Sequence, residues 1–279
     1  MQSVQIDTHM HEHQIYQIYY NDQTKAQNDL GFRGLNNLQN ARPDWSEYWP
    51  IRDFLLRTEL REDCYYAFFS PKFKEKTGLN AKEVFNFLDH SNQDIVAFSP
   101  YFDQSAIFLN LFEQGAANHP NIWPCFENSF NLVNPAIETS TLVMTSKNTI
   151  FCNYFAAKKH VWIEWLTECE KIFAVAEDGK SELAKLLNDS VNHSGAHNPA
   201  KVFVTERMIS YLLATKNKWS ARFFNPMSLP VSPAPISKYM DELVKLDALK
   251  IAFRETGFQE YIDTFASLRA DLINHIQSR

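Results

Sequence analysis

The sequence predicts an α/β fold in which a mixed sheet is flanked by helices and followed by a C-terminal helical extension. Short apolar runs at residues 15–20, 64–70 and 94–100 have the length and β-rich composition of buried strands. Segments with helical periodicity follow these runs, an order typical of βαβ units around a parallel core. With 279 residues, the chain is long enough to bury one large core.

The first half of the chain alternates strands with helices. In chain order we expect a strand at 15–20, a long loop at 21–45, a helix at 46–60, a strand at 64–70, a basic loop at 71–78, a short helix at 80–90, a strand at 94–100 and a helix at 105–120. Asn80 and Glu83 have the spacing of a capping box, which places the start of the short helix. Loops as long as 21–45 are usually functional, so this segment is a candidate for ligand binding.

The second half is more helical. We expect one or two strands within 141–159, an amphipathic helix at 160–179 that continues helically to 191, a loop at 192–200, a helix at 202–215, a strand at 219–226, an irregular proline-rich connector at 227–237 and two C-terminal helices that break near Gly257. The predicted division is therefore a catalytic-type domain at 1–226, followed at 227–279 by a connector and helices that pack on the same domain.

Composition excludes several classes of protein. The 7 glycines are too few for a glycine-rich phosphate loop and argue against an eight-fold α/β barrel, which needs many tight turns. The formal net charge of −6, without a basic patch, argues against nucleic-acid binding. Aromatic residues reach 14%, which indicates a heavy aromatic core or a groove that stacks flat ligands.

The four cysteines are widely spaced and form no CxxC pair, which predicts buried thiols in a reducing compartment rather than a disulfide framework. The N-terminal residues lack the pattern of a signal peptide, and no apolar stretch is long enough to span a membrane. We therefore expect a cytoplasmic protein, with peripheral contact at the inner face of a membrane left open.

The histidines near the N-terminus suggest one kind of site. The stretch IDTHMH at 6–11 resembles the first-strand signature of amidohydrolases, in which two histidines two residues apart grip a metal. That chemistry needs further ligands on later strand ends, and the remaining histidines do not follow strands in the required order. A metal-dependent hydrolase built on His9 and His11 is thus an alternative interpretation, and a lead-in to the first strand is the simpler one.

A second set of segments resembles bacterial glycosyltransferases of the GT-A type, in particular those of polysaccharide and lipopolysaccharide gene clusters. The segments are IYQIYY, RPDWSEYWP, YYAFFSPKFKEKTG, DIVAFSPYFDQ, FEQG with HP, IFCNYFAAKKHVWIEWL and VFVTER, and they span about residues 14 to 215. Their order and spacing carry the resemblance. It implies a GT-A-like, Rossmann-like mixed sheet and transfer of a sugar from a nucleotide-sugar donor to a glycan or lipid-linked acceptor.

The resemblance also implies roles for particular residues. It puts Gln17 and Tyr19 near the base of the donor, Asp103 near the donor phosphates as a catalytic or metal-binding group, Asn153 near the acceptor, and Glu206 and Arg207 on the final motif near the active centre. Enzymes of this type usually carry an Asp-x-Asp motif that holds Mg²⁺ or Mn²⁺ against the diphosphate. Here AFSPYFDQ has one carboxylate, so either a lone Asp103 binds Mg²⁺ or Mn²⁺ or cationic side chains replace the metal.

Residue chemistry adds further candidates. Lys72, Lys74 and Lys76 could neutralise a leaving phosphate, Trp45 and Trp49 could stack on a sugar or base, and His119 could act as a general base because its ordinary pKa is near neutral. Each candidate has a structural alternative. The lysines could form a solvated face, Asp103 could cap a helix, Glu206 and Arg207 could form a structural pair, and His119 could be a hydrogen-bonded core residue. A non-catalytic module that binds nucleotides or glycans is the remaining alternative function.

Overall fold

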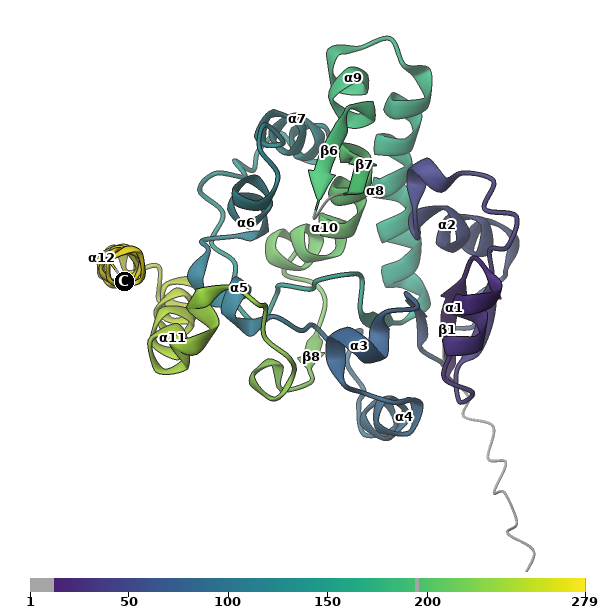
Figure 1. Ribbon diagram of the computed structural model, residues 1–279, viewed down its shortest axis with the longest axis horizontal. Helices are drawn as coiled ribbons and strands as arrows, with labels where there is room; N and C mark the ends of the chain where they lie inside the picture. The colour runs from purple at the N-terminus through teal and green to yellow at the C-terminus, as the bar shows by residue number, and fades with distance from the viewer. Residues whose placement is uncertain (1–12, 194–195, 279) are drawn as a thin grey trace, which may run out of the picture.

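The computed structural model describes residues 13–193 and 196–278, whose centre is a six-stranded mixed sheet (Figure 1). The strand order is β2-β1-β3-β5-β4-β8, with bounds β1 Gln14–Tyr19, β2 Arg33–Asn36, β3 Tyr66–Phe69, β4 Ile95–Ala97, β5 Phe155–Ala157 and β8 Ala221–Phe223. Every neighbouring pair is parallel except for those that involve β5, which runs antiparallel to both β3 and β4. The predicted α/β class and mixed sheet are confirmed at this level.

Alternation along the strands separates two apolar faces. In β3, Tyr66 and Phe68 join one buried cluster, whereas Ala67 and Phe69 join the other. This follows from the two-residue period of a strand, which sends successive side chains to opposite faces. Because both faces are covered, the central strands are apolar throughout, which is why their runs were detectable in the sequence.

Helices cover the two faces unequally. The cluster on the face with Tyr66 and Phe68 includes side chains of α2 Tyr48–Arg57, α6 Leu111–Asn118, α7 Trp123–Val133, α8 Lys159–Asp178, α9 Glu182–Asn188 and α10 Ala200–Thr215, of which α6, α7 and α9 pack on other helices. The opposite face is covered by α3 Phe73–Thr77 and α4 Ala81–Asp89, below the sheet in Figure 1. The larger cluster contains Trp45, Trp162 and Trp165, all without exposed surface. Much of the aromatic content of the chain therefore serves the core.

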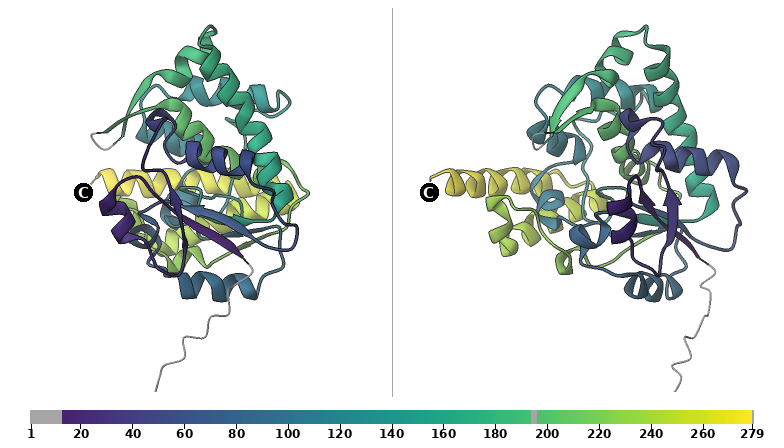
Figure 2. Two further views of the ribbon diagram at one scale, coloured as in Figure 1. Left: turned by 90° about the vertical axis from the view of Figure 1, so that its right-hand side faces the viewer. Right: turned by 45° about the vertical axis from the view of Figure 1, so that its right-hand side comes forward.

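The C-terminal helices form a third cluster at one side of the molecule. Helix α5 Phe102–Ile107 packs against α11 Met240–Thr256, which in turn packs against α12 Gln259–Gln277. The right-hand view of Figure 2 shows α12 extending away from the sheet, with the C-terminus at its far end. Gly257, with φ of 72°, ends α11, which confirms the predicted break between the two C-terminal helices.

Several local predictions are wrong in instructive ways. The expected loop at 21–45 contains α1 Asp22–Gln27, β2 and the 3₁₀ turn η1 Pro43–Trp45. Helix α1 begins at a capping box in which Asn21 and Thr24 form reciprocal hydrogen bonds. Its six residues are too few to show helical periodicity in the sequence. Strand β2 is an edge strand with mostly exposed residues, so it lacks the apolar run of a buried strand.

Two further segments differ from expectation. The basic loop at 71–78 contains α3, because Phe73 is buried and anchors a short turn that Gly78 ends. The predicted helix at 105–120 is two helices, since Asn110 accepts hydrogen bonds from the backbone N–H groups of Phe112 and Glu113 and starts α6 afresh. The expected loop at 192–200 is part of a hairpin formed by β6 Ser190–His193 and β7 Ala196–Pro199. Helix α7, at Trp123–Val133, lies in a segment for which no element was predicted.

The helices at 80–90 and 160–179 are confirmed. Helix α4 has the predicted capping box of Asn80 and Glu83, and α8 ends at Gly179 with φ of 69°. The four cysteines are free thiols, as predicted. No helix within the described residues combines the length and the apolar composition needed to cross a membrane.

Candidate functional site

One edge of the sheet gathers polar groups from distant parts of the chain. The parallel strands β1, β3 and β4 have their carboxyl ends at this edge. Because β5 runs the other way, the residues that precede it, Cys152 to Tyr154, lie at the same edge. In open α/β sheets ligands bind outside the carboxyl ends of the strands, so this edge is the natural candidate site.

Unusual backbone conformations occur at the same edge. Tyr101 after β4 has φ of 65°, and Cys152 and Asn153 before β5 have φ of 59° and 53°. Ser46, with φ of 49°, lines a cavity with Ile18 at the end of β1. A non-glycine residue in the left-handed region costs of the order of 1–3 kcal/mol, and such residues concentrate at functional sites.

Lys76 brings a positive charge to this edge from α3. Its Nζ donates a hydrogen bond to Cys152 Sγ at 3.2 Å, and the side chain is half-buried. Burial lowers the pKa of Lys76, but Cys152 and Glu206 raise it by more, so the pKa lies above its ordinary value. Burial raises the pKa of the Cys152 thiol to about 11, although Lys76 opposes this shift. Near neutral pH the pair is therefore an ammonium group donating to a neutral thiol.

Glu206 faces this lysine from α10. Burial, followed by the carboxylate of Glu47, raises the pKa of Glu206 to about 7, while Arg207 and Lys76 oppose the shift. A carboxyl group that titrates near neutral pH can accept or release a proton under physiological conditions, as a general base or acid must. Glu206, which the resemblance places on the final motif, thus has a pKa suited to proton transfer near neutral pH.

Glu47 is a member of this group that sequence reasoning missed. It falls within the helix predicted at 46–60, lies just before α2 and accepts a hydrogen bond from Ser46 Oγ at 2.7 Å. Ile18, Asn37 and Glu47 line a cavity of about 180 Å³ beyond the end of β1. Glu47 lies at the end of a polar segment that follows a strand, and this position is the sequence signal that could have indicated Glu47 as a site residue.

Asn153 is the second unusual polar group. Its side chain is 6% exposed, and its Oδ1 has no hydrogen-bond partner within the part of the chain that the structure describes. Buried polar atoms are nearly always paired, so an unpaired acceptor at a site edge indicates a ligand or an ordered water. The hydroxyl group of Tyr154 beside it is paired with Ser70 Oγ at 2.6 Å. Asn153 therefore presents the free acceptor of this loop.

Gln17 and Tyr19, predicted near the donor base, lie on β1. The Gln17 carboxamide donates to the carbonyl groups of Ser70 and Pro71 at 3.3 and 3.4 Å and accepts from Asp29 N at 2.8 Å. These bonds tie β1 to its neighbouring loops. The Tyr19 ring lies close over Gly34 on β2. Their role in donor binding stays a prediction.

Asp103 is placed differently from the other candidates. It is 0% exposed, and its Oδ1 accepts from Ser232 N at 2.9 Å. Its Oδ2 accepts from Gln104 Nε2 at 3.0 Å and from Ser232 Oγ. Both carboxylate oxygens are used to fasten the connector to α5, so Asp103 does not fit as the ligand of Mg²⁺ or Mn²⁺ that the resemblance implies.

His119 and Arg207 are core residues. The His119 ring is buried and packs against the Phe203 ring, with 4.2 Å between the ring centroids and an interplanar angle of 36°. Arg207 donates to Leu111 O, Phe203 O and Gln114 Oε1, all at 3.0 to 3.1 Å, and burial lowers its pKa to about 10. Its guanidinium group therefore joins α10 to α6. The proposed donor contact of Arg207 and the base role of His119 stay predictions.

The two tryptophans of the proposed acceptor site differ in exposure. Trp45 is 0% exposed, and its Nε1 donates to Glu177 Oε1 at 3.0 Å, so its ring supports the core. Trp49 lines an open groove of about 720 Å³ between β2 and α2, where the guanidinium groups of Arg42 and Arg52 lie 5.6 and 5.7 Å from its ring. Trp49 is thus the one of the pair that borders open space.

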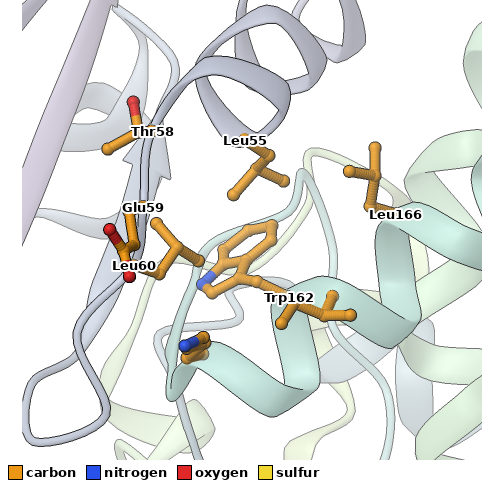
Figure 3. Close-up of a pocket in the computed structure, with 8 residues that line it drawn as sticks. Leu55, Thr58, Glu59, Leu60, Trp162 and Leu166 are labelled. Carbon is orange, nitrogen blue, oxygen red and sulfur yellow. The ribbon is translucent and has the colours of Figure 1, made fainter.

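Two other features lie outside this edge. A smaller cavity of about 170 Å³ lies between α2 and α8, where Leu55, Leu60 and Leu166 surround Trp162 (Figure 3). Trp162 Nε1 donates to Tyr66 O at the start of β3, so this cavity borders the opposite end of the strand. Lys72 is exposed at the start of α3. His9 and His11 lie outside the described residues, and His13 Nε2 is 3.6 Å from Asp89 Oδ1.

No group of three or more His, Cys, Asp or Glu side chains suited to a metal ion occurs between residues 13 and 193 or between 196 and 278. Comparison with family models, with curated proteins and with solved structures finds no match to the chain.

Proposed function

We propose that the protein is a glycosyltransferase that moves a sugar from a nucleotide-sugar donor to a bacterial surface glycan, with Glu206 as the general base. The observation that carries the proposal is Glu206, a carboxyl group with a pKa of about 7 that interacts electrostatically with Lys76 at the carboxyl edge of the sheet. The mixed sheet, with one antiparallel strand among parallel ones, is compatible with the GT-A-like fold that the segment order implies.

The proposed chemistry follows from these side chains. Glu206 accepts the proton of an acceptor hydroxyl group, whose oxygen forms a bond to the anomeric carbon of the donor sugar. The bond between that carbon and the phosphate oxygen breaks, and the nucleotide leaves with the electron pair. Positive charge beside the departing phosphate stabilises the transition state.

A panel of nucleotide sugars tests this proposal. We expect at least one uridine, guanosine or cytidine donor to raise the midpoint of thermal unfolding and to be turned over, by transfer or by slow hydrolysis. Glu206→Gln should lower turnover about 10²–10⁴-fold, because the proton acceptor is lost, while donor affinity stays nearly constant. Glu182→Gln, an exposed change on α9, is the matched control.

Two results would count against the transferase. If no donor shifts the unfolding midpoint, the chain does not bind nucleotide sugars. If a donor binds and is never turned over in the presence of glycan acceptors or water, the non-catalytic binding module is the correct interpretation. Free thiols at all four cysteines support a cytoplasmic site for this proposed reaction.

A further inference from the structure

We infer that Lys76, rather than a divalent cation on Asp103, supplies the positive charge at the donor phosphates, and that Asn153 binds a hydroxyl group of the same ligand. This inference rests on the proposed function and names how the site would hold its donor. Three observations lead to it: the three hydrogen bonds that the buried carboxylate of Asp103 already accepts, the ammonium group of Lys76 with a thiol rather than a described carboxylate as its partner, and the free acceptor of Asn153.

Asp103 cannot take a metal without losing structure. Its two oxygens accept hydrogen bonds from the backbone N–H and hydroxyl groups of Ser232 and from the Gln104 amide. A divalent cation takes oxygen ligands that have free lone pairs and room for coordinating water, and a carboxylate that is 0% exposed and fully bonded offers neither. In enzymes with an Asp-x-Asp motif, a bound divalent cation supplies the positive charge at the donor phosphates. Here a cationic side chain must supply that charge instead.

Lys76 has the free capacity to do this. An ammonium group has three N–H donors, and here one of them goes to a thiol, which is a weak acceptor. No described carboxylate forms an ion pair with Lys76 within 4.0 Å, and Glu206 acts on it only at longer range. A half-buried cation without a paired anion is costly unless an anionic ligand completes it. Phosphate oxygens match the two remaining donors.

Asn153 identifies the rest of the ligand. Its buried Oδ1 is an acceptor, so it cannot bind a phosphate oxygen that is itself an acceptor, but it can bind a hydroxyl group. Asn153 follows Cys152, the residue that Lys76 touches, and both hold the left-handed backbone conformation. A ligand with a phosphate group next to a sugar hydroxyl group fits both side chains, and a nucleotide sugar has this combination.

The experiment measures binding of nucleoside diphosphates and of inorganic pyrophosphate by calorimetry, once with EDTA and once with Mn²⁺. We expect a diphosphate to bind in EDTA with an affinity within about threefold of that in Mn²⁺. Lys76→Met should weaken binding about tenfold or more, because a charge-assisted hydrogen bond is lost. Lys82→Met, an exposed change on the neighbouring helix α4, should leave the affinity unchanged.

A second variant covers the case in which Lys76→Met does not fold. Asn153→Asp has the same shape and tolerates the left-handed backbone, but it adds a negative charge near the ammonium group. It should weaken diphosphate binding about tenfold while unfolding near the parent temperature. Full affinity in both variants would overturn the inference.

The two proposals fail in different ways. Diphosphate binding that requires Mn²⁺ overturns the role of Lys76 and leaves the transferase in place. Binding of pyrophosphate in EDTA that depends on Lys76, without binding of any nucleotide, supports the anion site and overturns the transferase. If neither nucleotides nor pyrophosphate bind under either condition, both proposals are wrong.

Discussion

Glu206 lies where its environment opposes its charge. The side chain is half-buried on α10, burial and the carboxylate of Glu47 raise its pKa, and the positive charges of Arg207 and Lys76 only partly compensate. Natural proteins rarely keep such a group without a function, because replacing it would stabilise the fold. The cost in stability is therefore itself an argument that Glu206 serves the site, and it can be measured.

Stability should depend on pH through this group. In the unfolded chain Glu206 loses its proton near pH 4.5, whereas in the folded protein it keeps the proton up to about pH 7. The folded state binds more protons between these values, so the free energy of unfolding falls as pH rises from 4.5 to about 7. We predict that Glu206→Gln is more stable than the parent at pH 8, by about 1–3 kcal/mol.

Urea unfolding at pH 5 and pH 8 checks this prediction. The stabilisation should be close to zero at pH 5, because the parent side chain is then protonated and resembles glutamine. The exposed Glu182→Gln variant should change stability by less than about 0.5 kcal/mol at both pH values. A Glu206→Gln protein that is equally destabilised at both would show that the carboxylate has structural partners instead.

At the scale of elements, charged contacts hold the segment that carries Glu47. Lys201 on α10 is 2% exposed and donates to Asp44 Oδ2 at 2.6 Å and to Asn188 Oδ1 at 2.8 Å. Arg42 joins Asp44 to Glu177 on α8. Hydrogen bonds from Arg42, followed by those from Lys201, lower the pKa of Asp44 to about 2. The turn η1 is thus fixed against two helices.

We predict that Lys201→Met destabilises the protein by about 1–3 kcal/mol, because it removes the buried ammonium group that joins Asp44 to Asn188, although Asp44 keeps its bonds from Arg42. Denaturant unfolding gives the value. Lys185→Met is the matched control: its ion pair with Glu182 is exposed and should contribute less than about 1 kcal/mol. Equal effects of the two changes would show that the η1 contacts do not hold the fold.

The connector is held by Asp103 in the same manner. Ser232 donates both its backbone N–H and its hydroxyl group to this carboxylate, and Tyr101 N donates to Pro230 O beside it. We predict that Asp103→Ala lowers the free energy of unfolding by about 2–4 kcal/mol, since three donors lose their acceptor in the interior. Ser232→Ala, which removes one of the three bonds, should cost about 1 kcal/mol.

The same variants separate structure from catalysis. If Asp103 acted directly on the donor, Asp103→Asn would abolish turnover without a matching loss of stability. We expect instead that the folded fraction of Asp103→Asn retains diphosphate affinity within about threefold of the parent, because the site edge is formed by other residues.

For the whole molecule, the C-terminal helices matter because they share a buried apolar cluster with α5. Phe102 and Ile107 of α5 are buried against Leu246 of α11, and Lys250 Nζ donates to Ser105 O and Phe108 O at 2.5 and 2.6 Å. Burial lowers the pKa of Lys250 to about 7. Arg254 adds bonds to the carbonyl groups of Val143 and Ala214. Helix α11 is therefore bonded to several parts of the chain.

We predict that a chain ending at residue 238 does not fold stably. Its loss of α11 and α12 exposes the apolar face of α5, and each large side chain contributes about 1.5–3 kcal/mol when buried. Thermal unfolding by circular dichroism and calorimetry should show one cooperative transition for the full chain and none for the shortened one. A shortened chain that unfolds within a few degrees of the parent would contradict this.

Local signals in the sequence were enough for many elements. The apolar runs of β1, β3 and β4, the capping box of α4 and the glycines that end α8 and α11 follow from the chemistry of neighbouring residues. Edge strand β2 and helices α1 and α3 escaped, because a short or exposed element has no long periodic pattern. The division of the predicted helix at 105–120 into α5 and α6 also escaped, because it depends on the capping hydrogen bonds of a single side chain, Asn110.

The sequence by itself determined the α/β class and the positions of the main elements, and it put Glu206 and Lys76 among the candidate site residues. Only the tertiary structure decided which polar groups meet. Residues 47, 76 and 206 are far apart in the chain but interact electrostatically in the fold, and the antiparallel direction of β5 puts Cys152 and Asn153 at the same edge. Burial and pairing arise from contacts between distant segments, so only the fold could place Asp103 in a structural bond network and give Lys76 a thiol rather than a described carboxylate as its partner.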